Sequence, residues 1–474
     1  MSTVVSENNQ SVIRPVPILI AFLIAGFVGL FSETALNMAL GRLMIELDVV
    51  SSTVQWITTG YLLTMGILIP VSALLIQWFS TRQLFVASLL FSILGAIVSG
   101  MAPTFAVLLL GRIIQAVGTG LLIPLMFNTV LIIFPIHRRG TVMGLIGLVM
   151  MSAPAIGPAT SGLIIEMLSW NWILWLLLPF LLFSLVYGLI YVQNVTTLSK
   201  PKIDVLSIVL STIGFGGLVY GFSLAGDKGW GDALVIGAIV IALASLVIFS
   251  FRQLKLDSPM LDLRAFKYPM FTLGVLSVAA TFMIILSSMI LLPLYLQTGL
   301  GLTALAAGLV LMPGGALNGI MSPLVGRLFD THGPKWLITP GFIIMLVMLI
   351  SLSKVTTATS ALMVILLHSG LMIGVSFVMM PAQTNGLNQL PRHLYPDGTA
   401  LVNTLMQVSG SIGTALAITI MSASQNSFLE KVVDPTDPAL ASTSLTAGIQ
   451  TAFGLGIGLA ISGLIASLFI KSSR

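Results

Sequence analysis

The 474-residue sequence contains no cysteine, and only 7% of its residues are charged, whereas about a quarter are charged in soluble domains. The missing thiols exclude disulfides, thiol catalysis and cysteine-ligated metals. No second histidine or carboxylate stands at ligand spacing from His368, so we expect no metal site and no cofactor.

The sequence also lacks a nucleotide-binding loop and a recognisable catalytic arrangement. No Gly-rich loop followed by Lys and Ser or Thr is present, which argues against an ATP-driven pump. No arrangement of nucleophile, base and orienting group indicates an enzyme. The net charge of +5 does not indicate nucleic acid, because the basic residues lie between long apolar runs.

Apolar residues make up 57% of the chain and recur in runs of about 20, the length of a helix that crosses a bilayer. A β-barrel would show short alternating segments instead. We therefore predict an all-α, multi-pass cell-membrane protein whose lipid-facing surface contacts the bilayer. The fourteen expected spans are 16–38, 54–77, 84–101, 105–134, 140–167, 172–192, 204–224, 233–251, 270–295, 304–326, 336–352, 361–386, 398–423 and 448–470.

Basic residues divide unequally between the two sides that these spans define. Of the 20 Lys and Arg residues, 15 fall on the side of the two termini, four on the other side, and Arg112 inside a span. The positive-inside rule then predicts that both termini are cytoplasmic. Residues 1–10 lack Lys and Arg, and no cleavage pattern follows the first apolar run, so we read that run as a retained span rather than a signal peptide.

An internal repeat divides the chain. Gly66, Pro70, Leu75 and Arg82 each have a counterpart exactly 253 positions later, at Gly319, Pro323, Leu328 and Lys335. A shared register between two halves is typical of transporters that rock about a central site. We predict a six-helix half at 1–202, a two-helix insert at 203–252 and a second six-helix half at 253–474.

Four sequence motifs fall on these spans. The second repeat copy reads Gly326-Arg-Leu-Phe-Asp330-Thr-His-Gly333-Pro-Lys335, whereas the first has Ala73, Gln77 and Ser80 at the matching positions. Span 4 contains Leu110-Gly-Arg112-Ile-Ile-Gln115-Ala-Val-Gly118-Thr-Gly120, and span 5 contains Gly147 and Ala153-Pro154-Ala-Ile-Gly157-Pro158, followed by Gly162. Span 1 contains Ser32-Glu33-Thr34-Ala35-Leu36-Asn37.

These motifs resemble those of the fourteen-span drug:proton antiporters of the major facilitator superfamily, most closely the branch associated with lincomycin resistance. The resemblance implies a cytoplasmic gating loop with Asp330 beside basic partners, a proton-coupling motif around Arg112, and an antiporter signature in span 5. The departures in the first copy weaken the case for a charge lock at Arg82. We assign gating and helix packing to Gly326, Asp330, Gly333, Arg82, Gly147, Pro154, Gly157, Pro158 and Gly162. Static packing is the alternative for the span 5 glycines and prolines.

Glu33 and Arg112 are ionisable residues at membrane depth, which is a functional-site hypothesis in itself. Counting about 1.5 Å per residue from the span ends places both in the outer half of the membrane. Desolvation favours the neutral acid, so Glu33 is the expected proton carrier, and Arg112, which stays charged, tunes it. A protonated glutamate and a structural arginine that only bond neighbouring helices are the alternatives.

Several other polar residues fall within the spans, and either substrate contact or helix-bridging hydrogen bonds explain each of them. The substrate-cavity candidates are Asn37, Tyr61, Gln115, Asn128, Tyr295 and Asn403. Glu166 is read as an interfacial residue and His368 as a hydrogen-bonded bundle residue.

The resemblance implies a monomeric exporter of small lipophilic antimicrobials such as lincosamides, dyes and quinolones, driven by the proton gradient through alternating access. Few acidic residues lie in the spans, so we expect neutral or singly charged substrates. A lipid or glycolipid translocase on the same scaffold is the alternative. The span 5 pattern argues against nutrient uptake.

Overall fold

The computed structural model describes residues 14–196, 198–430 and 438–471, and within them every regular element is a helix. The first group of helices is α1 (Pro15–Ala35), η1 (Leu36–Ala39), α2 (Leu40–Glu46), α3 (Ser51–Val54), α4 (Trp56–Trp78), α5 (Thr81–Gly100), α6 (Phe105–Ile133), α7 (Ile136–Met167), α8 (Asn171–Trp175) and α9 (Leu177–Tyr191). Next come α10 (Val205–Ser211), η2 (Thr212–Gly216), α11 (Gly217–Lys228), α12 (Ala233–Lys255) and η3 (Leu263–Lys267). The last group is α13 (Pro269–Leu294), η4 (Tyr295–Gly299), α14 (Ala304–His332), α15 (Lys335–Leu352), α16 (Ala361–Asn388), η5 (Arg392–Leu394), α17 (Tyr395–Leu429) and α18 (Pro438–Leu468).

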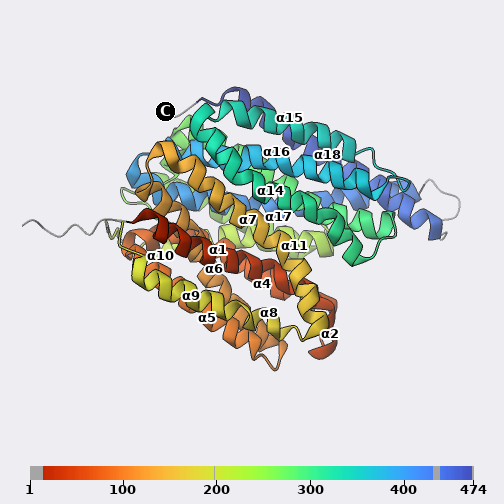
Figure 1. Ribbon diagram of the computed structural model, residues 1–474, viewed down its shortest axis with the longest axis horizontal. Coiled ribbons are helices and arrows are strands. Elements are labelled where there is room, and N and C mark those ends of the chain that lie inside the picture. Colours follow the sequence, from red (N-terminus) through yellow and green to blue (C-terminus); the bar gives the residue numbers. More distant parts are fainter. Residues whose placement is uncertain (1–13, 197, 431–437, 472–474) are drawn as a thin grey trace, which may run out of the picture.

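In the described part of the chain, thirteen segments are long and apolar enough to cross a membrane, and they coincide with thirteen of the fourteen expected spans. The remaining expected span, 140–167, lies within the 32-residue helix α7. Both ends of the described chain lie at the same end of the molecule (Figure 1). We call it the inner end, because it is the side predicted to be cytoplasmic.

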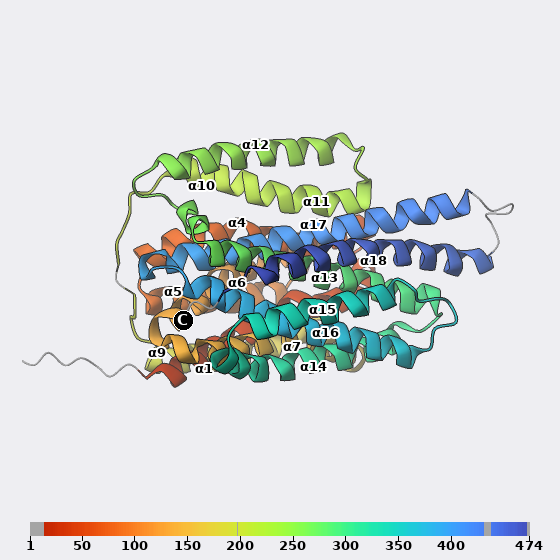
Figure 2. The same cartoon turned by 90° about the horizontal axis from the view of Figure 1, so that it is seen from above.

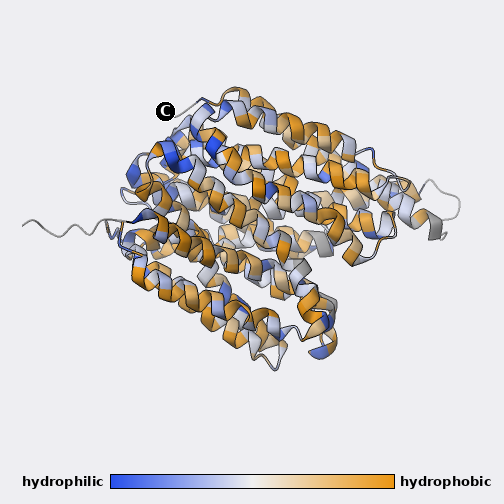
Figure 3. Ribbon diagram, viewed as in Figure 1, coloured by the Kyte–Doolittle hydropathy of each residue, from blue (hydrophilic) through white to orange (hydrophobic). Residues whose placement is uncertain are grey.

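Local sequence signals define where the helices begin and end. Ser80 and Gln83 form a reciprocal capping box at the start of α5, and Thr303 caps α14 through the backbone N–H of Ala306. Gly333 ends α14 at a φ of 82°, a conformation that glycine adopts without a steric penalty. Hydrophobic residues run along the helices, and hydrophilic ones gather mostly at the inner end (Figure 3).

The packing of the helices follows the internal repeat. Helix α4 packs against α17, and α14 packs against α7. The repeat matches α4 to α14, so each copy contacts a helix of the opposite half, as a two-fold relation requires. Helices α10 to α12 lie beside α4 and α17, on the outside of this junction (Figure 2).

The two halves meet at the inner end through α7 and α14. A Cβ on Gly326 would lie 2.2 Å from the carbonyl oxygen of Gly140, and one on Gly144 would lie 2.4 Å from that of Ser322. Only glycine permits this backbone approach. Toward the opposite end the ribbons of the two halves diverge (Figure 1). The molecule is therefore held together at its inner end.

Candidate functional site

Arg112 is the centre of a polar cluster inside the first half. Its side chain is 0% exposed, and its Nη1 donates to the Ser32 hydroxyl at 2.8 Å and to Gln115 Oε1 at 2.7 Å. The guanidinium carbon lies 4.3 Å from the ring centroid of Tyr61, a cation–π contact. The sequence motif on α6 thus places Arg112 against both α1 and α4.

Tyr61 on α4 connects the cluster to Thr119, which lies one turn after Gln115 on α6. Its hydroxyl lies 2.7 Å from Thr119 Oγ1 and donates to the Gly29 carbonyl oxygen at 3.3 Å. Arg112, Gln115 and Thr119 follow at three- and four-residue spacing, so they share one face of α6. Two predicted cavity residues, Tyr61 and Gln115, therefore belong to the network that holds Arg112.

Glu33 lies beside this cluster and is half-buried. It neighbours Ser32, which Arg112 contacts, so Glu33 and Arg112 lie at a similar height along the helix bundle. The two side chains are near enough to attract each other electrostatically. Among the described residues, Glu33 nevertheless forms no hydrogen bond or ion pair with a protein group. Its carboxyl group can therefore accept a proton or a ligand without first breaking a protein contact.

Two nitrogens of Arg112, Nε and Nη2, have no hydrogen-bond partner in the described structure. A buried cation with unused donors is costly, and such groups mark functional positions in membrane proteins. The unused donors of Arg112 and the carboxyl group of Glu33, which has no protein partner, make this cluster a candidate site for a proton or a ligand.

The other predicted cavity residues do not join this cluster. The exposed side chain of Asn37 accepts a hydrogen bond from Thr58 Oγ1 at 2.6 Å. The hydroxyl of Tyr295 donates to the carbonyl oxygen of Thr356 at 2.7 Å, and the amide of Asn403 donates to the carbonyl oxygen of Thr399, within its own helix. Asn128 is fully buried, and neither its amide nitrogen nor its oxygen has a partner.

The predicted gating residues fall into two groups. The Asp330 carboxylate accepts hydrogen bonds from the backbone nitrogens of Gly140 and Thr141 at 2.8 Å each and from the Thr141 hydroxyl at 2.7 Å. Asp330 thus binds the backbone of the second turn of α7, across the two halves. Arg82 instead donates to the Leu189 carbonyl oxygen within the first half.

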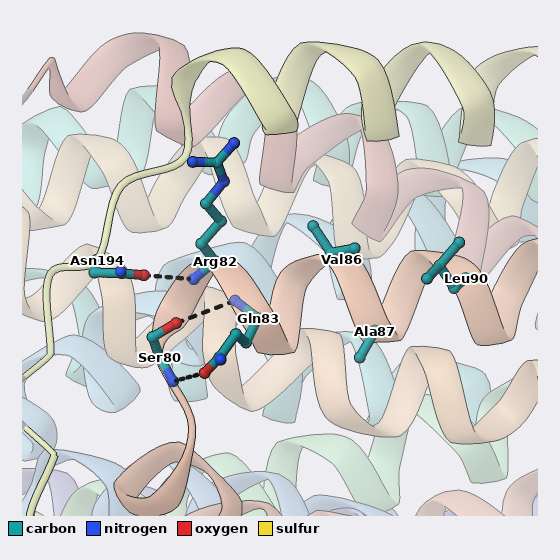
Figure 4. A pocket seen from close by; sticks show the side chains of 7 residues that line it. All are labelled: Ser80, Arg82, Gln83, Val86, Ala87, Leu90 and Asn194. Carbon is teal, nitrogen blue, oxygen red and sulfur yellow. Dashed lines mark hydrogen bonds between the residues drawn. The ribbon is translucent and has the colours of Figure 1, made fainter.

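Arg82 lines a surface pocket at the start of α5 (Figure 4). Its guanidinium points away from Asn194, which accepts a hydrogen bond from the Arg82 backbone nitrogen at 3.2 Å. The other lining residues are Ser80, Gln83, Val86, Ala87 and Leu90. All residues that line this pocket belong to the first half, so the pocket does not contribute to the contact between the halves.

The span 5 residues also differ in their surroundings. Cβ atoms on Gly147 and Gly157 would lie 2.7 Å from Met380 and 2.6 Å from Thr34, respectively, so both glycines permit close packing. A Cβ on Gly162 would meet nothing within 4 Å, so no close helix approach is seen at that residue in this structure. Pro154 is half-buried in α7, and the side chain of Pro158 lies outside the described part of the chain.

Arg139 is the residue that the sequence reasoning missed. Arg138 and Arg139 both counted as loop charges, yet Arg139 lies in the first turn of α7 and is only 4% exposed. Its guanidinium donates to Asn388 Oδ1 at 2.7 Å and to the Tyr395 hydroxyl at 3.1 Å, and to the carbonyl oxygens of Leu131 and Phe134. It therefore joins the ends of α6 and α16 to the start of α17. The sequence gives no signal that separates Arg139 from its exposed neighbour.

Two minor candidates also have defined surroundings. Glu166 is exposed, as expected for an interfacial residue. His368 is buried, and its ring packs where a Cβ on Gly314 would lie, 2.3 Å from the ring. Its Nδ1 has no hydrogen-bond partner among the described residues.

Comparisons with known proteins agree with this architecture. The model of the Major Facilitator Superfamily matches residues 22–414. Lincomycin resistance protein LmrB of Listeria monocytogenes is 60% identical over 98% of both chains, and LmrB of Bacillus subtilis is 60% identical over 97% of this chain and 96% of its own. The probable multidrug resistance protein EmrY of Escherichia coli is 26% identical over 90% of this chain and 85% of its own.

Solved structures show the same fold at low identity. The human organic anion transporter MFSD10 covers 96% of this chain and 99% of its own with a TM-score of 0.62 at 12% identity. The proton:xylose symporter XylE covers 97% of this chain and 96% of its own, with a TM-score of 0.63 at 14% identity. The fold and the buried polar site define a membrane transporter rather than an enzyme. The chain belongs to the major facilitator superfamily.

Proposed function

We propose that this protein exports lipophilic antimicrobials in exchange for protons, with Glu33 as the group that carries the proton. The names of its full-length relatives support drug efflux as the activity. The observation that carries the coupling is the half-buried Glu33 carboxyl, which has no protein partner and lies beside the buried Arg112.

The coupling follows from two opposing influences on Glu33. Removal of water favours its neutral form, whereas the Arg112 charge favours the carboxylate. A change in hydration as the transporter opens and closes shifts this balance, so the proton can be taken up on one side and released on the other. A bound drug that excludes water or contributes its own cation changes the same balance. Protonation and drug binding are then mutually exclusive.

The substrate class follows from the same charges. One carboxyl group serves at most one positive charge, so we expect neutral and singly charged lipophilic drugs to be preferred over dications. Lincosamides such as lincomycin are the first class to test, because the relatives at 60% identity carry that name.

Proteoliposomes with an imposed pH gradient test the proposal. Wild-type protein should accumulate drug only when the gradient is present, and a protonophore should abolish accumulation. Glu33→Gln should lose gradient-driven transport while it still equilibrates drug passively. Glu166→Gln, the exposed carboxylate of α7, serves as the matched control and should behave like the wild type. Undiminished gradient-driven transport by Glu33→Gln would rule out the proton-carrier role.

A further inference from the structure

Two buried amides occupy corresponding positions in the two halves of the molecule. Asn128 on α6 is 0% exposed and Gln383 on α16 is 1% exposed, and in each side chain both the nitrogen and the oxygen lack a hydrogen-bond partner. Each lies five residues before the last residue of its helix, Ile133 or Asn388. They are 255 positions apart in the sequence, within two positions of the spacing of the internal repeat.

Both amides lie on helices that contact the other half as well as their own. Beside Gln383, Ala382 and Gly386 pack against Gly274 of α13 in the same half, and Met380 packs against Gly147 of α7 in the other half. Both amides are therefore buried within helices that pack against neighbours in both halves.

Packing contacts bring these two helices to the junction between the halves. Helix α6 contacts α17, and α16 contacts α7, so each amide-bearing helix packs across the junction. One turn before Gln383, Met380 contacts Gly147 of α7. Helix α17 contacts both α6 and α16 and contributes Thr404, whose buried hydroxyl also has no partner in the described structure.

Arg139 closes this region toward the inner end. Its guanidinium binds the carbonyl oxygen of Leu131, three residues after Asn128, and the side chain of Asn388, five residues after Gln383. Those separations are about 5 Å and 8 Å along the two helices. The amides thus lie one to two turns from the Arg139 contacts, which must break for the inner end to open to a substrate.

We propose that Asn128 and Gln383 form an inner subsite that hydrogen-bonds the uncharged amide and hydroxyl groups of a substrate when the inner end opens. This inference rests on the proposed drug export. Amides supply both donors and acceptors, and neither residue is charged, so the subsite selects neutral polar groups. Unpaired buried polar groups are costly in a membrane protein, and a bound substrate satisfies them during the cycle.

The test compares two probes that differ in hydrogen bonding. Lincomycin carries an amide and several hydroxyl groups, whereas tetraphenylphosphonium is a lipophilic cation with no hydrogen-bonding group. Purified Asn128→Leu, Gln383→Met and the double variant are titrated with each labelled probe. We expect the affinity for lincomycin to fall about tenfold in the double variant, while the affinity for tetraphenylphosphonium stays within about twofold.

Thermal stability separates this role from a structural one. Removing amides that have no partner should leave the apparent melting temperature of the empty protein unchanged or higher. Gln253→Met is the control, because this buried amide donates to Ser207 and accepts from the backbone nitrogens of Met260 and Leu261. That variant should lower the melting temperature without changing the ratio of the two affinities.

Four results would contradict the subsite. An equal loss of affinity for both probes in the double variant overturns the subsite and leaves the proposed drug export intact. An unchanged affinity for lincomycin in the double variant does the same. A fall in melting temperature comparable to that of Gln253→Met shows that the amides are structural. Failure of the wild-type protein to bind either probe contradicts the proposed function and, with it, this inference.

Discussion

Arg112 shows how one residue organises the candidate site. The single nitrogen Nη1 makes both of its hydrogen bonds, to Ser32 and Gln115, and the guanidinium carbon lies over the Tyr61 ring. A charged, planar group is required for this combination of contacts. Glu33 lies beside it without a partner, and this arrangement leaves the carboxyl group available.

Replacing Arg112 by Lys tests the importance of this geometry. Lysine keeps the charge but loses the planar group that stacks on Tyr61 and spans α1 and α6. We expect gradient-driven drug transport to fall by at least about tenfold, measured as initial rates in proteoliposomes. Arg42→Lys, at an exposed arginine paired with Glu46 on α2, should leave the rate unchanged. Full activity of Arg112→Lys would show that charge alone suffices.

Residues whose burial in the membrane costs free energy can be recognised from the sequence alone. A charge inside an apolar run is expensive, so Glu33 and Arg112 could be identified without coordinates. The partners of Arg112 could not, because Ser32 and Tyr61 resemble many other polar residues in the spans. Arg139 was misplaced for a related reason. A basic residue at a helix start normally marks a solvated loop, and only the packing of three other helices buries it.

At the scale of elements, the pair α7 and α14 provides the principal contact between halves. Gly140, Gly144 and Gly326 bring the two backbones together, and Asp330 then reaches the start of α7. The sequence singled out Gly326 and Asp330 but not Gly140 or Gly144. It did not predict that the carboxylate would bind backbone nitrogens of α7, since that depends on which helix lies opposite.

The variant Gly326→Ala tests the close approach. A methyl group would lie 2.2 Å from the Gly140 carbonyl oxygen, so the helices must separate. We expect a loss of about 1–3 kcal/mol in stability, seen as a lower apparent melting temperature in detergent. Gly308→Ala in the same helix is the control, because a Cβ there meets nothing within 4 Å. Equal melting temperatures for the two variants would refute the packing role of Gly326.

An ion pair and hydrogen bonds around Asp204 join the two helices of the insert at the inner end. Asp204, just before α10, accepts hydrogen bonds from Arg252 Nε at 2.7 Å and Nη2 at 3.1 Å, and from the Ser207 hydroxyl at 2.6 Å. Its hydrogen bonds with Arg252 and Ser207 lower the pKa of Asp204 from 3.8 to about 2. A carboxyl group whose pKa is lower in the folded state stabilises the fold above its unfolded pKa, and loses that effect as the pH falls through the folded value.

The variant Asp204→Asn should therefore be less stable than the wild type near neutral pH. The difference should shrink as the pH falls from about 4 to about 2, because the wild-type carboxyl becomes protonated in that window. Apparent melting temperatures across this range provide the measurement. Ser207→Ala, which removes only one of the three hydrogen bonds, should have a smaller effect. A difference that does not depend on pH would show that the charge of Asp204 does not contribute.

At the scale of the whole molecule, the helices are closed at the inner end and diverge toward the other (Figure 1). Contacts of Arg139 and Asp330 hold this closure. Hydropathy and the repeat were sufficient to predict the spans and the all-α class, because the bilayer restricts the chain to helices of a defined length. The state of closure depends on side-chain contacts between distant helices, and the sequence did not reveal it.

The variant Arg139→Gln should shift the molecule toward opening at this end. The shorter neutral side chain cannot join α6, α16 and α17 as Arg139 does. Because the chain has no cysteine, single labels can be introduced at the exposed positions His137 and Thr331 without background. Pulsed electron spin resonance between these labels should show a longer distance population in the variant. Arg138→Gln, at the exposed neighbour, should retain the wild-type distribution.

The most direct test of the account is proton release on drug binding by the purified transporter. In weakly buffered detergent solution at a pH where Glu33 is protonated, addition of a saturating drug should release protons from the wild type and none from Glu33→Gln. Glu166→Gln should release as many protons as the wild type. Equal release from Glu33→Gln and the wild type would contradict the central claim that Glu33 exchanges its proton for drug.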